Sequence, residues 1–103
     1  VLVNEAVSLL ADSGMENPQR LLAPLLSASL DNALRLGDKG LTGPVARGDR
    51  EVIRTHLDAL QERPSSQNAY RALARLATDR ALDAGVLSVD QAADLLIELG
   101  ETP

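Results

Sequence analysis

Apolar side chains recur along this chain at every third or fourth residue, which is the spacing of one face of an α-helix. Glycine and proline interrupt the pattern, and no segment alternates apolar and polar residues in the manner of a strand. The sequence therefore predicts an all-α fold, a bundle of about five helices with a core of Leu, Val and Ala. The predicted helices cover Val1 to about Ser13, Asn17 to Gly37, Gly48 or Asp49 to about Leu60, Pro64 to about Ala84, and Ser88 to Gly100.

Two of these helices carry clear start signals, and one carries an internal proline. Asn17 followed by Pro18 places a capping residue before a proline at the first helical position. Ser88 and Gln91 have the spacing of a capping box, in which each side chain bonds the backbone of the other residue. Pro24 removes one backbone donor inside the second predicted helix and crowds the preceding turn. We therefore expect a kink or a split at Pro24.

The segment from Gly37 to Gly48 is the stretch that neither a core nor a solvated helix surface explains. Connections between helices in small domains usually span about 2–8 residues, so this one is long. Its glycines permit positive φ and its proline fixes φ, which indicates a defined backbone conformation. Long ordered loops on helical scaffolds commonly carry binding or catalytic residues. The run of interest is Leu41-Thr42-Gly43-Pro44-Val45-Ala46-Arg47-Gly48-Asp49.

Several features of this run suit an anionic ligand. Thr42 offers a hydroxyl group, and Gly43 allows a ligand or another backbone to approach closely. Arg47 offers a planar fork of donors for a carboxylate or phosphate, and the helix that begins near Asp49 adds exposed N–H groups. A purely structural alternative is equally open: Arg47 would pair with Asp49 or a helix C-terminus, and Thr42 would only satisfy the turn. Asp49 itself is expected to cap the third helix.

Composition narrows the classes of function. The 103 residues suffice for one domain, and without cysteine the chain has neither disulfides nor cysteine-based zinc sites. A net charge of −5 and a single aromatic residue, Tyr70, argue against nucleic-acid binding, which relies on basic surfaces and base stacking. No apolar run approaches the length of a bilayer span, about 20 residues. We expect a cytoplasmic protein that binds neither nucleic acid nor membrane.

Patterns for catalysis and metal binding are weak in this sequence. The only histidine, His56, shares the apolar stripe of the third helix with Val52, Ile53 and Leu60, so we expect a partly buried helix histidine. Asp58 is two residues away and points elsewhere, so a Ser–His–Asp arrangement is not supported. Acidic residues are scattered singly and no metal-ligand spacing occurs, so no metal is assigned. Glycine-rich dinucleotide and Walker patterns are lacking.

The first helical pattern begins at Val1 itself, with no initiator Met and no capping residue before it. Natural chain starts are usually polar and frayed. We therefore expect this chain to be a piece of a longer protein that was cut inside a helix.

Three segments resemble a known family: Leu30-Asp31-Asn32-Ala33-Leu34, the run from Leu41 to Asp49, and Tyr70-Arg71-Ala72-Leu73-Ala74. They are similar to a C-terminal helical domain, of uncharacterised function, that follows a Rossmann-like NAD(P)-binding domain in a bacterial oxidoreductase-like family. That family is akin to ketopantoate reductase and to the 6-phosphogluconate dehydrogenase C-terminal-like group. The resemblance covers nearly the whole chain, and the run from Thr42 to Asp49 is its most specific part.

The resemblance implies a fold like the 6-phosphogluconate dehydrogenase C-terminal domain, in a parent protein whose N-terminal Rossmann-like domain binds NAD(P). The helical domain would close one wall of the cleft between the domains and contact a small anionic substrate, such as the 2-keto acid ketopantoate. It would bind no cofactor by itself. We hypothesise that Arg47 holds the anionic group of the substrate or a phosphate edge of the cofactor. The residues that the resemblance places in the cleft are Thr42, Gly43, Pro44, Arg47 and Asp49, with Asn32 as a further candidate.

The resemblance also implies a homodimer that the helical domain helps to build. Ala69, Ala77 and Ala81 form a face of small residues on the fourth predicted helix, and we expect this face to pack across a symmetric dimer. The main alternative is a helical protein-interaction module without a catalytic role. A nucleic-acid-binding helical domain is a third reading, which the acidity of the chain disfavours.

Overall fold

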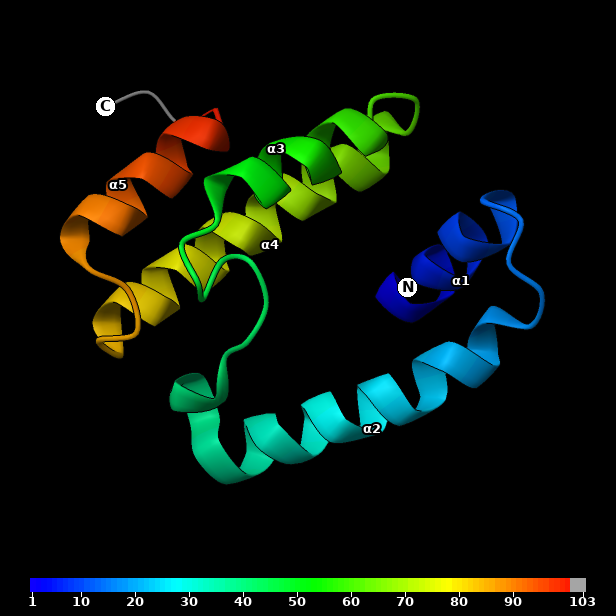
Figure 1. The fold of residues 1–103 in the computed structure, drawn as a ribbon, viewed down its shortest axis with the longest axis horizontal. Helices are drawn as coiled ribbons and strands as arrows, with labels where there is room; N and C mark the ends of the chain where they lie inside the picture. The colour runs from blue at the N-terminus through cyan, green and yellow to red at the C-terminus, as the bar shows by residue number, and fades with distance from the viewer. Residues whose placement is uncertain (101–103) are drawn as a thin grey trace. The chain divides into compact units, whose positions relative to one another are not determined.

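The computed structural model describes residues 1–100, and these residues form helices and turns with no strand (Figure 1). The all-α prediction is thereby confirmed, and the predicted ends at glycine and proline agree with the observed ones to within a few residues. The elements are α1 (Leu2–Asp12), α2 (Pro18–Leu36), the short 3₁₀ helix η1 (Gly37–Gly40), α3 (Arg50–Ala59), α4 (Pro64–Asp83) and α5 (Val89–Glu98).

The helices belong to two compact units, Val1–Arg35 and Leu36–Pro103. The first unit contains α1 and nearly all of α2. Helix α2 continues through Pro24 without a break, so the predicted split does not occur. Pro24 and Arg20 are both exposed. Water can therefore reach the Arg20 carbonyl, which loses its helical donor to the proline, and the helix tolerates the defect.

The first unit buries very little. Pro18 is its only buried residue, and α1 has none. Five leucines of α2 that the apolar pattern assigned to a core are each 40–78% exposed, so that expectation is wrong for this unit. They are Leu21, Leu25, Leu26, Leu30 and Leu34.

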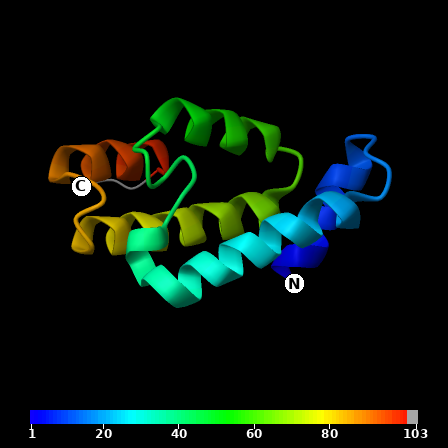
Figure 2. The same ribbon diagram turned by 60° about the horizontal axis from the view of Figure 1, so that its bottom comes forward.

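The second unit holds the core. Helix α5 packs against both α3 and α4, and α4 runs along the length of the unit (Figures 1 and 2). Leu41, Val45, Tyr70 and Val86 are half-buried and pack against the same cluster. Aliphatic side chains dominate, as predicted. The buried cluster consists of Ile53, Leu57, Ala74, Ala81, Leu87, Leu95 and Leu99.

The burial of Ala81 corrects one part of the predicted dimer face. Its side chain is 0% exposed within the core of the second unit, whereas Ala69 and Ala77 are half-buried. On α4, alanine occupies both the buried core position and the less buried positions that could contact a partner. Sequence alone therefore could not separate them, and Ala81 is not on a surface open to a second copy.

Polar side chains close the helix ends of the second unit. Gln67 Nε2 donates to the Leu57 carbonyl at 2.8 Å, and Arg71 Nη1 donates to the Leu99 carbonyl at 2.9 Å. Both carbonyls lie in the last turn of a helix or just beyond it, where carbonyls lack the regular helical donor. The Leu57 carbonyl also accepts from Leu60 N at 3.2 Å. The predicted capping box of α5 is present, with Gln91 N donating to Ser88 Oγ at 3.1 Å and Ser88 N donating to Gln91 Oε1 at 3.0 Å.

Candidate functional site

The run from Leu41 to Asp49 forms a closed turn between η1 and α3. Arg47 N donates to the Gly43 carbonyl at 3.2 Å, Gly48 N to the Val45 carbonyl at 3.0 Å, and Asp49 N to the Pro44 carbonyl at 2.9 Å. The donors and acceptors of these three bonds all lie within the run itself. Gly43 and Gly48 have φ of 94° and 68°, so the predicted positive φ is confirmed at both ends of the turn.

Contacts on both sides fix this turn to the second unit. Leu41 and Val45 pack against the hydrophobic core. A Cβ atom at Gly48 would lie 3.0 Å from Nε2 of Gln91, at the start of α5. On the N-terminal side, Arg80 Nε of α4 donates to Asp38 Oδ1 of η1 at 2.8 Å. The turn is therefore an ordered part of the unit and not a slack connection.

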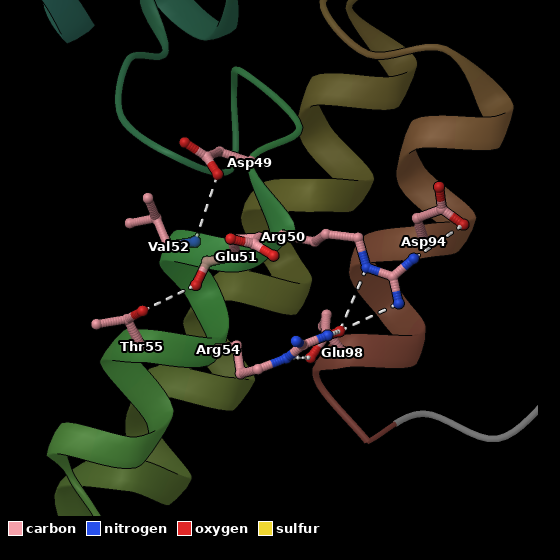
Figure 3. Close-up of polar contacts among 8 residues, drawn as sticks. All are labelled: Asp49, Arg50, Glu51, Val52, Arg54, Thr55, Asp94 and Glu98. Carbon is pink, nitrogen blue, oxygen red and sulfur yellow. Dashed lines mark hydrogen bonds and ion pairs between the residues drawn. The ribbon is translucent and has the colours of Figure 1, made fainter.

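Asp49 caps α3, as predicted. Its Oδ1 accepts a hydrogen bond from Val52 N at 3.3 Å, and Glu51 lies in the first turn of the helix (Figure 3). The carboxylate accepts a hydrogen bond from one of the N–H groups that lack a helical acceptor, and its negative charge suits the positive end of the helix dipole. Asp49 thus has a structural task, whatever else it contacts.

The structure brings together five of the six predicted site residues. Thr42 and Arg47 are exposed, while Gly43, Pro44 and Asp49 are half-buried in the same turn. Among the residues described, Arg47 has no side-chain hydrogen bond or ion pair, so the alternative in which it pairs with Asp49 is not observed.

Asn32, the sixth predicted residue, belongs to α2 in the first unit and is not part of this turn. Its Oδ1 accepts a hydrogen bond from Arg35 Nη2 at 3.3 Å, and Arg35 Nε also donates to Asp31 Oδ2 at 3.0 Å. Asn32 is thus engaged in a local helix-surface contact.

The sequence did not predict an ion-pair cluster that joins α3, the helix after the turn, to α5. Arg50 and Arg54 lie one turn apart on α3, and both point at Glu98 of α5 (Figure 3). Arg50 Nη2 lies 3.1 Å from Glu98 Oε1, and Arg54 Nη2 lies 2.5 Å from the same oxygen. Arg50 Nη1 also lies 3.9 Å from Asp94 Oδ1. The i, i+4 spacing of the arginines was visible, but nothing in the sequence indicated an acceptor 44–48 residues away.

This cluster positions α3 against α5 and leaves little capacity for a ligand. The hydrogen bond from Arg54 is the main reason that the pKa of Glu98 lies below its ordinary value, with Arg50 contributing in the same direction. The same bond raises the pKa of Arg54. Because Glu98 already accepts from both guanidinium groups and its side chain is only 12% exposed, the cluster acts as a clamp on the two helices.

The only histidine is half-buried, as predicted, and contacts the only aromatic residue. His56 Nδ1 and the Tyr70 hydroxyl oxygen are 2.8 Å apart in a hydrogen bond, and the two rings are 5.6 Å apart in an edge arrangement. Burial raises the pKa of Tyr70. The pair joins α3 to α4, and among residues 1–100 no carboxylate bonds His56 to orient it for acid–base chemistry.

Within the described part of the chain, no three His, Asp or Glu side chains are grouped so that they could hold a metal ion. No helix in residues 1–100 has the length and apolar character that crossing a bilayer requires.

Fold and site together define an all-α protein whose second unit presents an ordered, cation-bearing turn. The chain belongs to the family described as a domain of unknown function, DUF2520, whose model matches residues 1–77. The match includes the whole turn from Leu41 to Asp49 and the other two resembling segments, residues 30–34 and 70–74. No curated protein and no solved structure matched the chain.

Proposed function

We propose that this chain is the C-terminal, substrate-side domain of a cytoplasmic NAD(P)-dependent oxidoreductase-like protein and that it contributes to a homodimer. The parent would carry an N-terminal Rossmann-like domain, and the helical domain would resemble the 6-phosphogluconate dehydrogenase C-terminal domain. The substrate would be a small 2-keto or 2-hydroxy acid such as ketopantoate. Support comes from the resemblance in the run from Thr42 to Asp49, which lies inside the matched family segment.

The observation that carries the proposal is the exposure of the Arg47 side chain on an ordered turn. Its backbone sits in a closed turn packed on the core, whereas its guanidinium group is exposed and has no partner among the described residues. A planar fork held in this way can bind a carboxylate through two parallel hydrogen bonds. Thr42 exposes a hydroxyl group on the same turn. Because the turn is already ordered, little conformational freedom is lost when an anion binds.

The proposal assigns the dinucleotide site to the parent's other domain. Residues 1–100 contain no strand, and the chain lacks the glycine pattern that follows a strand in dinucleotide sites. In the proposed parent, NAD(P) would therefore bind mainly to the Rossmann-like domain and supply the hydride chemistry. The part left to this chain is to hold the anionic group of the substrate, or a phosphate edge of the cofactor, with Arg47.

Steady-state kinetics of the full-length protein with candidate 2-keto acids and reduced cofactor tests this proposal. Loss of a charge-assisted pair costs about 1.5–3 kcal/mol, so Arg47→Ala should lower kcat/KM about 10- to 100-fold. Arg47→Lys should retain part of the activity, because it keeps the charge and loses the fork. Arg20→Ala removes an exposed cation in the other unit and is the matched control. An unchanged kcat/KM for Arg47→Ala would remove this residue from the site.

A second candidate, the helical interaction module without a catalytic role, is favoured by the exposed leucines of α2. The same series of variants separates the two candidates. A pure interaction module would show no turnover with any 2-keto acid and no response to Arg47→Ala. The sequence encoded ahead of Val1 provides an independent check, because the oxidoreductase proposal requires a strand–turn–helix dinucleotide signature there.

A further inference from the structure

Gln91 of α5 lies directly against the turn that carries Arg47. A Cβ atom added at Gly48, the residue after Arg47, would lie 3.0 Å from Gln91 Nε2, 3.3 Å from its Cδ and 3.4 Å from its Cγ. The amide of Gln91 therefore occupies the space that a larger residue at position 48 would need. Neighbouring Cα atoms lie about 3.8 Å apart across a trans peptide bond, so the Arg47 Cα lies within about 8 Å of Nε2. An arginine side chain and a small anion together can span that distance.

The capping box of α5 fixes which end of the Gln91 amide faces the turn. Ser88 N donates to Gln91 Oε1 at 3.0 Å, which identifies Oε1 as the acceptor end of the amide. The atom beside Gly48 is therefore the donor, Nε2. Among residues 1–100, Nε2 has no hydrogen-bond acceptor, and the residue is exposed. Gln91 thus presents an oriented donor without a partner next to the guanidinium group of Arg47, which also has none.

We infer that Gln91 Nε2 is a second donor to the anion that Arg47 binds, and that this anion is a carboxylate. The inference rests on the Arg47 part of the proposed function and deepens it; it does not depend on the redox part. An ionised carboxylate offers about four acceptor positions, of which an arginine fork takes two. The others need a further donor. An amide already held by a capping box supplies one with little loss of conformational freedom.

The charge around the turn favours a carboxylate over a phosphate. The run from Leu41 to Asp49 contains one cation, Arg47, and one carboxylate. Arg50, the next cation along the chain, is paired with Glu98 (Figure 3). A phosphate monoester carries about −1.5 to −2 charges at neutral pH, which a single arginine does not balance. A carboxylate carries one charge, and the neutral amide of Gln91 adds a hydrogen bond without requiring more.

Calorimetric titration of the full-length protein with pyruvate, a small 2-keto acid, tests the inference without requiring turnover. Gln91→Glu should raise the dissociation constant about a hundredfold, because it removes a donor and places a negative charge beside the ligand. Glutamate serves a capping box as well as glutamine does, so the urea midpoint should stay unchanged. A purely structural role of Gln91 would therefore leave the dissociation constant unchanged as well.

Two further variants separate the lost donor from the added charge. Gln91→Met removes the donor, adds no charge and keeps a side chain of similar length beside Gly48, so it should raise the dissociation constant about tenfold. Gln61→Glu is the matched control. It adds the same charge at an exposed position just beyond the C-terminal end of α3, the end opposite the turn, and should not change pyruvate binding.

The outcomes distinguish this inference from the proposed function. Pyruvate binding that Arg47→Ala weakens but neither Gln91 variant changes overturns the inference and leaves the proposed function intact. An effect of Gln91→Glu without any effect of Gln91→Met shows repulsion alone and overturns the donor role. Inorganic phosphate that binds more tightly than pyruvate overturns the carboxylate assignment. If pyruvate does not bind at all, both the inference and the substrate-binding role of Arg47 in the proposed function are wrong.

Discussion

The two units of this protein are built from the same kinds of helix, yet only one of them has a core. In the second unit Ile53 and Leu95 are fully buried, together with small residues such as Ala81. In the first unit five leucines of α2 remain exposed and α1 buries no residue. An amphipathic pattern therefore predicts that one face of a helix is buried, but it does not predict whether the element that buries it belongs to the same chain.

The two units also differ in the sequence separation of their side-chain contacts. The second unit has ties between elements far apart in sequence, among them Arg54 with Glu98 and Arg80 with Asp38. The side-chain contacts of Asn32 and Arg35 in the first unit stay within one turn of α2. Contacts within a turn stabilise a helix by only a few tenths of a kcal/mol, whereas burial in a shared core contributes about 1.5–3 kcal/mol per large side chain.

The largest expected effect comes from truncating matched leucines in the two units. Leu95→Ala should lower the free energy of unfolding by about 2–5 kcal/mol, because it opens a cavity in the core. Leu25→Ala removes a leucine that is 57% exposed and should cost less than about 1 kcal/mol in dilute solution. Urea denaturation followed by circular dichroism measures both values. Similar costs for the two variants would show that α2 is buried in the isolated chain after all.

A smaller effect should separate two glycines, one in each unit. Gly48 has φ of 68°, and an added Cβ would meet Gln91 Nε2 at 3.0 Å; Gly14 has φ of 97° and nothing within 4 Å. Left-handed backbone costs a residue with a Cβ about 1–2 kcal/mol. Gly48→Ala should lower the unfolding free energy of the second unit by about that amount, because its turn is packed on the core. Gly14→Ala should leave the same unfolding transition unchanged, and a shift of equal size in both variants would contradict the comparison.

Much of the local structure could be predicted from sequence because local chemistry determines it. The helix ends at glycine and proline, the Asp49 cap and the Ser88 capping box each depend on residues within one turn. The half-buried position of His56 followed from its place on the apolar stripe of α3. The closed turn before α3 was expected as an ordered loop, and its positive φ values were indicated by glycine.

What could not be predicted depends on partners distant in sequence. Glu98 and Arg50 are 48 residues apart, and no spacing rule joins them. The exposure of Leu30 and the burial of Ala81 depend on which helices meet, which the apolar pattern does not specify. The role of Arg47 as a ligand-binding residue stays a prediction, because none of the described residues pairs with its guanidinium group to indicate what it binds.

The smallest expected effect concerns acid, and it should again appear in one unit only. The folded-state pKa of Glu98 lies below its ordinary value of about 4.3 because Arg54 and Arg50 bond its carboxylate. The stabilisation is therefore complete above the unfolded pKa and is lost as the pH falls through the lower folded pKa. Glu98→Gln should reduce the urea midpoint at pH 7 and flatten its decline as the pH falls below the ordinary pKa of a glutamate. The effect should be modest, since Arg50 and Arg54 are 42% and 55% exposed and water screens the pairs.

Asp31→Asn is the matched control in the first unit. It breaks the Arg35 pair of α2, whose side chains are 59% and 62% exposed, and should leave the midpoint and its pH dependence unchanged. If Asp31→Asn flattened the acid response as strongly as Glu98→Gln, the first unit would share the electrostatic stabilisation that the structure assigns to the second alone.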